Sequence, residues 1–480
     1  MYLKPILFFV IYYCSELLMG QHTTFELLLD SQQEQVGTDI FEDERGNFYC
    51  VGFSSEPKSD YRKGFILKID PFGKLIDSVT YMLPDQACTI YSILQDTPGV
   101  FILSSYLSDT TSSHYHTKIK LQRVDYELNI IKESTMHVSD DHQMLVVSTT
   151  LGINNDILIT GGIIKDLPPY TMYLNARFNN DLDSVHASVK NLATGGLSIK
   201  QLNDTSYWLM DWSYHYFLCD TLFNITDYYD VPEHVDNPVG VKWDSDTSFF
   251  FAGEWNGGPD DDIGIIRQYH PFDQTGYLFN SWGTMDTLDI TALNGALDFR
   301  CKDSVFVGGT TGFVWPEEGY HPSYYSLIQT DSLLNIRWER FYGSDEHYYV
   351  LHDVLATRDG GCLLTGTRFD YDAGADDRDI YILKLNSEGL ILGEHNYNKP
   401  ALKEAIVYPN PGTNQIKVRI AAQYPQCIFE LYDVNGNKVI SQEIIGKWGE
   451  TNTSFLSPGS YVYQIHNNEG LFETGKWVKH

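Results

Sequence analysis

The sequence is poor in cysteine, and its cysteines are not arranged in pairs. Six of the seven cysteines follow residue 20, and none of them forms a Cys-x-x-Cys motif. Six cysteines in a chain of 480 residues are too few for a dense disulfide framework. We expect buried free thiols, with one or two disulfides left open, at Cys50, Cys88, Cys219, Cys301, Cys362 and Cys427.

Basic side chains are also scarce. The chain has 33 Lys and Arg against 64 Asp and Glu, which gives a formal net charge of -31. The segment from Glu404 to the end holds six basic and seven acidic side chains, so nearly all of the negative charge lies before it. An acidic surface of this kind repels nucleic-acid phosphate and anionic lipid. We therefore expect no nucleic-acid partner, and a surface that stays soluble and attracts cations.

Long apolar runs are confined to the first residues. Lys4 is followed by the apolar run Ile6–Tyr13, and small or polar residues lie around Gly20. This pattern predicts a secretory signal peptide over residues 1–20. A lipoprotein anchored through Cys14 is the less favoured alternative, because the bulky Tyr13 precedes it. No later segment has the roughly 18 apolar residues of a membrane-spanning helix, so we expect no transmembrane segment.

Catalytic signatures are missing as well. The sequence has no His-Glu-x-x-His zinc motif, no Gly-x-Ser-x-Gly elbow, no phosphate-binding loop and no sialidase-type Asp box. The histidines are scattered, and the pair His114 and His116 falls in a polar segment that reads as a solvated loop. We therefore assign no catalytic residue and favour a protein that is not an enzyme, although the composition leaves this open.

The chain is rich in Tyr (33), Phe (25) and Gly (38), and it has few helical patterns, which favours an all-β protein. Between residues 25 and 400 it is self-similar, with a period of about 40 to 60 residues. Asp43–Gly52 and Arg358–Gly366 each read as a polar turn, a strand and a glycine. Ile66–Gly73 is matched in the same way by Ile382–Gly389. Such a repeat predicts strands joined by tight turns.

One polar position recurs at the end of a strand in every copy. An Asp or Asn there can accept backbone N–H groups two residues on and fix a tight turn, which is a structural role rather than a catalytic one. The members of this turn column are Asp70, Asp125, Asn179, Asp220, His270, Asp331 and Asn386.

Seven copies at this period predict a seven-bladed β-propeller over residues 21–400, with a solenoid as the alternative. The units loosely resemble the degenerate propeller repeats of secreted bacterial proteins. The copy around Asn203–Tyr229 departs most from that pattern. Phe25–Leu29 precedes the first full copy, so we expect it to be an outermost strand that pairs with the last blade.

Two acidic loops are expected on the same face of the propeller. Gly257–Asp262 and Asp370–Asp379 each combine glycine with closely spaced carboxylates, and Ca²⁺ takes six to eight oxygen ligands of this kind. Ordinary solvated acidic loops are the favoured interpretation, and calcium binding is the functional alternative. The predicted calcium ligands are Asp260, Asp261, Asp262, Asp376, Asp377 and Asp379.

The end of the chain, from Glu404 to His480, has its own turn signals. Tyr408–Pro411 opens it, Leu431–Val439 contains an Asn-Gly turn, and Leu456–Ile465 is a turn followed by an alternating strand. Short strands between Pro, Gly and Asn turns predict a small Ig-like β-sandwich over residues 404–480, after a linker that begins near residue 400.

These motifs, together with Gly475–Lys479, closely resemble the type A C-terminal sorting domain of the type IX secretion system. The resemblance implies an address that is recognised by the secretion machinery at the outer membrane and delivers the protein to the cell surface or the medium. The residues it marks as the sorting signal are Pro409, Asn410, Pro411, Gly436, Pro458, Gly459, Tyr461, Gly475, Lys476, Val478 and Lys479.

Two classes of function remain for the region before this domain. The first is a non-catalytic binding or adhesion module for an extracellular glycan or protein. The second is a hydrolase or lyase that acts on polysaccharide or peptide. Exposed aromatic side chains in loops would suit stacking on sugars, although buried packing between blades is the plainer explanation for most of them. They are Trp212, Tyr214, Tyr216, Trp255 and Trp315.

Overall fold

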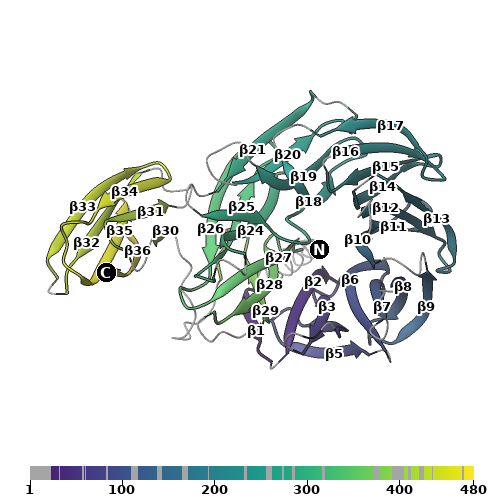
Figure 1. Cartoon of the computed structure of the whole chain (residues 1–480), viewed down its shortest axis with the longest axis horizontal. Coiled ribbons are helices and arrows are strands. Elements are labelled where there is room, and N and C mark those ends of the chain that lie inside the picture. The colour runs from purple at the N-terminus through teal and green to yellow at the C-terminus, as the bar shows by residue number, and fades with distance from the viewer. Residues whose placement is uncertain are drawn as a thin grey trace, which may run out of the picture.

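The computed structural model describes residues 23–479 with internal gaps, and every regular element in the described part is a β-strand (Figure 1). The expectation of an all-β protein is confirmed. The residues not described are 1–22, 32, 57–58, 60, 83–84, 110–116, 138–142, 165–170, 193, 214, 232–234, 256–261, 273–274, 284–286, 316–318, 372–377, 392–404, 409–411, 421–425, 435, 468–469 and 480.

In the described residues before 392, the strands form seven antiparallel sheets. The first sheet is β2 (Glu34–Glu42), β3 (Phe48–Ser55), β4 (Lys63–Ile69) and β5 (Leu75–Tyr81). The second is β6 (Gln86–Thr97), β7 (Val100–Asp109), β8 (Thr117–Asp125) and β9 (Ile130–His137). The third is β10 (Gln143–Leu151), β11 (Ile157–Ile164), β12 (Thr171–Phe178) and β13 (Ser184–Lys190).

The fourth sheet corresponds to the weakest copy of the sequence pattern, and it still has four strands. It is β14 (Gly196–Asn203), β15 (Ser206–Asp211), β16 (His215–Asp220) and β17 (Ile225–Asp230). The fifth is β18 (Asp236–Trp243), β19 (Phe249–Trp255), β20 (Asp262–Gln268) and β21 (Tyr277–Trp282). The sixth has five strands, β22 (Leu288–Thr291), β23 (Leu297–Cys301), β24 (Ser304–Phe313), β25 (Tyr324–Thr330) and β26 (Ile336–Tyr342).

The seventh sheet combines both ends of this region. It is β27 (Tyr348–Ala356), β28 (Cys362–Phe369), β29 (Asp379–Leu385) and β1 (Phe25–Leu29). β1 pairs with β29 in antiparallel register, so the expected pairing of Phe25–Leu29 is confirmed. The sheets follow one another around a common centre (Figure 1), and contacts between β27 and β2 join the last sheet to the first. None of the described sheets closes on itself as a barrel.

The turn column has the structural role expected of it. Asp331 Oδ1 accepts the backbone N–H groups of Leu333 (2.8 Å) and Asn335 (2.9 Å), and this turn connects β25 to β26. His270 accepts through Nδ1 from Phe272 N at 3.4 Å. Equivalent side-chain bonds to the backbone are made by Asp70, Asp125, Asn179, Asp220 and Asn386. These bonds are local in sequence, which is why the pattern could be read from the chain alone.

Four of these turns place a large apolar residue in the left-handed backbone region. Leu128, Leu182, Phe223 and Leu334 have φ between 57° and 63°, where Gly73 and Gly389 stand in other turns. Their side chains are buried. A left-handed backbone costs a non-glycine residue roughly 1–2 kcal/mol, and burial of a large apolar side chain offsets this with about 1.5–3 kcal/mol.

The innermost strands share an irregularity. In six sheets the register between the first and second strand shifts by one residue, which marks a β-bulge. The shifts lie between Gly37 and Asp39, Ile90 and Ser92, Val146 and Ser148, Gly196 and Ser198, Val239 and Val241, and Leu351 and Asp353. Because a bulge bends its strand and redirects side chains, all six sheets present a similar bent edge to the centre.

Five of the six described cysteines are buried free thiols, as expected, whereas Cys301 is exposed. Burial raises the pKa of the Cys50 thiol to about 12 and that of Cys88 to about 11. These thiols therefore pack as small apolar side chains.

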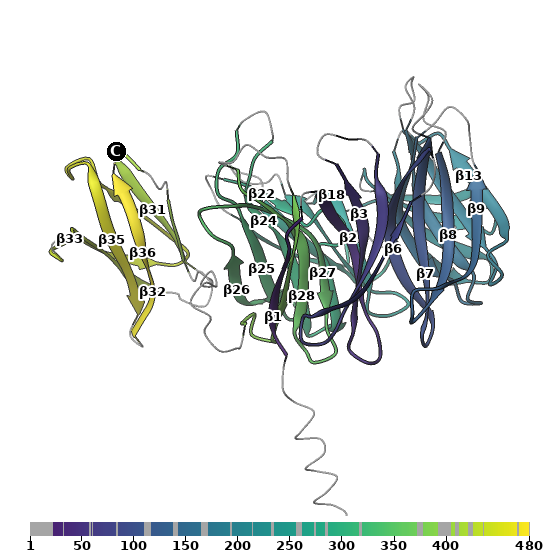
Figure 2. The same ribbon diagram turned by 90° about the horizontal axis from the view of Figure 1, so that it is seen from below.

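Residues 405–479, called the tail below, form two further antiparallel sheets (Figure 2). One is β30 (Ala405–Tyr408), β31 (Gln415–Ile420) and β34 (Trp448–Asn452). The other is β33 (Lys438–Ile445), β32 (Gln426–Tyr432), β35 (Gly459–Asn467) and β36 (Gly470–Lys479). Both sheets contribute to one buried core, which includes Ile416, Val418, Phe429, Ile465 and Trp477.

Candidate functional site

A cavity of about 530 Å³ lies where the innermost strands converge, and it is called the central cavity below. All seven sheets contribute to its lining, and most of the contributed residues are at or beside the bulges. They include Asp39 of β2, Ser92 of β6, Ser148 of β10, Ser198 of β14, Val241 of β18, Asp298 of β23 and Asp353 of β27. The cavity is therefore a product of the whole arrangement rather than of one segment.

The lining combines polar, aliphatic and aromatic side chains. Hydroxyl and amide groups are supplied by residues such as Thr149 and Asn294, and rings by Tyr91 and Trp212. Trp212 is held in place by two glycines, because a Cβ at Gly162 or Gly195 would lie within 2.7 Å of the indole ring. The cavity thus combines hydrogen-bonding groups with a fixed aromatic face.

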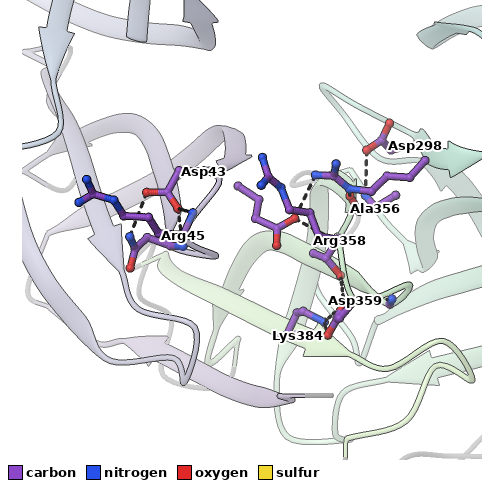
Figure 3. Close-up of polar contacts among 12 residues, drawn as sticks. Asp43, Arg45, Asp298, Ala356, Arg358, Asp359 and Lys384 are labelled. Atoms are coloured by element: carbon purple, nitrogen blue, oxygen red, sulfur yellow. Dashed lines mark hydrogen bonds and ion pairs between the residues drawn. The ribbon is translucent and has the colours of Figure 1, made fainter. Parts of the chain in front are cut away.

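Three carboxylates of the lining connect neighbouring sheets. Asp298 Oδ2 accepts the backbone N–H of Ala356 at 2.8 Å, which joins the sixth sheet to the seventh (Figure 3). Asp353 Oδ2 accepts from Ile40 N at 3.2 Å and joins the seventh sheet to the first. Asp39 Oδ2 accepts from Ile93 N at 2.8 Å and joins the first to the second. Together these bonds link the sixth, seventh, first and second sheets in succession.

Asp39 and Asp353 also interact with each other. Burial raises the pKa of Asp39 to about 7. Burial and then the charges of Asp39 and Asp298 raise the pKa of Asp353 well above its usual value. Two carboxylates in one desolvated place cannot both ionise easily, so the pair shares a proton near neutral pH. Both residues line the cavity, and Asp39 is the more open of the two.

The third carboxylate has a cationic partner. Lys242 Nζ lies 2.6 Å from Asp298 Oδ1, so Asp298 is neutralised by an ion pair. Charge is balanced in a similar way in the seventh sheet, where Lys384 Nζ lies 2.8 Å from Asp359 Oδ2 (Figure 3). The cavity therefore holds one ion pair and one proton-sharing carboxyl pair.

Glu42 of β2 strengthens the links between these sheets from outside the cavity. Its Oε2 accepts the backbone N–H of Arg358 at 2.8 Å and pairs with the Arg300 guanidinium at 3.0 Å. Arg300 Nε in turn donates to the carbonyl of Ala356 at 2.9 Å. The first, sixth and seventh sheets are thereby tied together by polar contacts between residues far apart in sequence.

The predicted calcium ligands fall mostly outside the described residues, as do His114 and His116. Asp260, Asp261, Asp376 and Asp377 are not described, and for Asp262 only its place at the start of β20 is. Asp379 begins β29, and its Oδ1 accepts the N–H of Ser31 at 3.0 Å. Within the described part of the chain, no group of three or more His, Cys, Asp or Glu side chains could hold a metal ion.

The aromatic side chains predicted in loops have different surroundings. Trp212 lines the central cavity, and Trp315 is 54% exposed. Trp255 is the last residue of β19 and packs against the ring of Phe279, so its prediction as a loop residue was wrong. Tyr216 is buried inside β16, so its prediction as an exposed loop residue was wrong, and Tyr214 is not described.

The central cavity itself was missed from the sequence. The only local signal was the set of small hydroxyl residues, Ser92, Ser148 and Ser198, within the first strand of three sheets. Serine is so common in the sequence that these three residues do not indicate a cavity without the structure.

In the tail, several predicted sorting residues have clear structural roles. Gly436 adopts φ 83° in the turn after Asp433, whose Oδ1 accepts from Asn437 N at 2.9 Å. The Tyr461 hydroxyl donates to the carbonyl of Ser457 at 2.8 Å, which closes the turn that contains Pro458 and Gly459. The residues Pro409, Asn410 and Pro411 and the predicted signal peptide lie outside the described residues.

The last strand closes the tail. A Cβ at Gly475 would lie 2.3 Å from the hydroxyl oxygen of Tyr463, so this position requires glycine. The Val478 carbonyl accepts from Gly412 N at 2.8 Å, and Lys479 Nζ donates to the carbonyl of Thr413. Lys476 is exposed. β36 is thus joined to the beginning of the tail as well as to β35.

A family model described as the secretion system C-terminal sorting domain matches residues 406–480. This match confirms the predicted nature of the tail. It indicates export by the type IX system through the outer membrane, to the cell surface or the extracellular space, and an interaction with that machinery. No curated protein matches the chain. None of the described residues belongs to a helix long and apolar enough to cross a membrane.

Proposed function

We propose that residues 21–400 form a seven-bladed β-propeller that serves as a non-catalytic binding module outside the cell. In this proposal residues 1–20 are a signal peptide, and the β-sandwich at 404–480 directs export. The single observation that carries the proposal is the central cavity, to which each of the seven sheets contributes its innermost strand. Rigid β-scaffolds that surround a polar cavity commonly bind ligands there.

Among the ligands considered, a short glycan fits the cavity better than a protein surface. A volume of about 530 Å³ is within the usual range for small-molecule sites, whereas a protein partner needs a broad exposed face. The serine, threonine and asparagine groups can bond sugar hydroxyls, and Trp212 offers a ring for stacking. The acidic surface disfavours polyanionic glycans.

The experiment is a glycan array with the purified full chain, followed by calorimetric titration of the best ligand. Ser198→Leu should abolish binding, because the larger side chain occupies the cavity without removing a described hydrogen bond. Trp315→Ala is the matched control, since Trp315 is exposed and does not line the cavity. Equal affinity of the Ser198→Leu and wild-type proteins would refute the cavity as the binding site.

A hydrolase or lyase remains the second candidate, favoured by one observation. Asp39 and Asp353 both line the cavity, and burial raises the pKa of each carboxyl, as in a general acid. Both carboxylates, however, also accept backbone N–H groups that join sheets. A panel of polysaccharides and peptides would decide: turnover lost in Asp39→Asn, with binding retained, would establish the enzyme.

A further inference from the structure

The strand β26 differs from the other outermost strands of the region before residue 392. In β5, β9 and β17 nearly every residue is exposed or half-buried. In β26, by contrast, the residues Trp338–Tyr342 are all buried. An outermost strand is normally in contact with water on its outer side, so other parts of the chain must cover β26.

One side of β26 is covered by the neighbouring seventh sheet. The indole N–H of Trp338 donates to the carbonyl of Ser387 at 3.3 Å, and the Tyr342 hydroxyl donates to the carbonyl of Gly389 at 2.9 Å. Residues 387 and 389 belong to the turn that follows β29. Since side chains alternate along a strand, Glu339 and Phe341 point to the opposite side.

The tail covers that opposite side. Arg419 of β31 forms an ion pair with Glu339, and both side chains are fully buried. The Arg419 guanidinium also lies over the Phe341 ring, 4.4 Å from its centroid. Tyr408 of β30 packs against the cluster formed by Phe341 and Tyr324.

A whole sheet of the tail takes part in this contact. The Arg419 guanidinium lies 5.4 Å from the ring centroid of Trp448, so β30, β31 and β34 all place a residue there. Figures 1 and 2 both show β31 on the side of the tail nearest the other sheets, with β33 farthest away. Arg419 alternates with Val418 and Ile420, which face the core of the tail.

We propose that this contact is a specific and reversible docking interface between the tail and β26, whose orientation is selected by the Arg419–Glu339 pair. Within the described residues, Nε and Nη1 of Arg419 and Oε2 of Glu339 have no hydrogen-bond partner. A buried ion pair that satisfies only some of its polar atoms costs more in desolvation than a fully bonded pair, and apolar residues in its place are often more stabilising. The pair therefore specifies the docked arrangement but limits its strength.

The docked orientation leaves the other sheet of the tail available. Lys476 of β36 is exposed, and Val462 of β35 is 46% exposed, on the sheet that does not carry Arg419. This consequence rests on the proposed role of the tail in export. The secretion machinery can therefore reach Lys476 and Val462 while the preceding region is folded and the tail is docked on it.

Hydrogen exchange of the full chain tests the docking without any measurement of export. Glu339→Leu leaves the charge of Arg419 buried without its partner. Arg419→Leu leaves the charge of Glu339 buried in the same way. Each single variant should raise the undocked population about a hundredfold, seen as faster exchange in the peptides that contain β26 and β31. The double variant should exchange as slowly as the wild type or more slowly, because both desolvation costs are removed.

Glu133→Leu is the matched control, because Glu133 lies on the outermost strand β9 and is paired with Lys120 far from the tail. It should leave exchange in β26 and β31 unchanged. Unchanged exchange in the first and second sheets confirms that each variant is folded, and Glu339→Gln offers a smaller perturbation in the same direction. The proposal is overturned if the single variants exchange like the wild type, or if the double variant exchanges as fast as the single ones.

Discussion

Raising the pH should destabilise the folded chain through the Asp39–Asp353 pair. Burial raises the pKa of Asp39 from 3.8 to about 7, and that of Asp353 rises for the same reason. A carboxyl whose pKa is higher in the folded state holds its proton more tightly there than in the unfolded chain. Its contribution to stability is therefore complete below the unfolded pKa and is lost as the pH rises through the folded value.

The magnitude follows from the pKa of Asp39. A shift of about three units at roughly 1.4 kcal/mol per unit gives about 4 kcal/mol between pH 4 and pH 8. This value is an upper limit, because Asp39 is partly open to the cavity and water there screens its charge. Asp39→Asn removes one charge but keeps an oxygen for the N–H of Ile93. At pH 8 the free energy of unfolding of the variant should exceed that of the wild type by up to this amount. At pH 4.5 the two values should be nearly equal.

The assay is denaturant unfolding of the full chain at several pH values between 4.5 and 8.5. The difference between variant and wild type is the quantity to follow, since the general repulsion of the acidic surface is nearly common to both. Asp77→Asn is the control, because Asp77 is exposed on β5 and lies outside the cavity. If the difference in unfolding free energy between Asp39→Asn and the wild type does not change with pH, the shared proton is refuted.

Three other predictions concern a turn, the acidic loops and the tail. Leu334→Gly should lower the free energy of unfolding by about 2 kcal/mol, because the lost burial outweighs the relief of the left-handed backbone. Leu333 is 62% exposed, so Leu333→Gly should lower it much less in the same denaturant titration. Millimolar Ca²⁺ should raise the melting temperature, with a smaller rise in Asp262→Ala or Asp376→Ala; a melting temperature unaffected by both calcium and chelator would exclude the site. Deletion of residues 404–480 should leave a folded protein in the periplasm, and fusion of that segment to a reporter with a signal peptide should bring the reporter to the cell surface or medium; normal export of the truncated protein would contradict the role of the tail.

Local interactions made part of this structure predictable. The turn at Asp331 depends on bonds to residues two and four positions away, so the same few residues create it wherever they occur. The Asn-Gly turn before Lys438 and the glycine at 475 belong to motifs of the same short range. For this reason the sequence by itself indicated the all-β class, the turn column and the sorting tail. The pairing of Phe25–Leu29 with the last sheet was expected because this segment precedes the first full copy of the repeat.

The site and the docking interface were decided only by the tertiary structure. Asp353 and Ile40, which meet at the cavity, are 313 residues apart, and Arg419 and Glu339 are 80 residues apart. The sequence around Asp39 does not distinguish it from the many other aspartates. The sequence around Glu339 does not distinguish it from an ordinary surface glutamate. Tyr216 was placed in a loop for the same reason, since its burial comes from the neighbouring sheet. Burial raises a carboxyl pKa or hides an ion pair only when distant strands exclude water together, and that exclusion is a property of the folded chain.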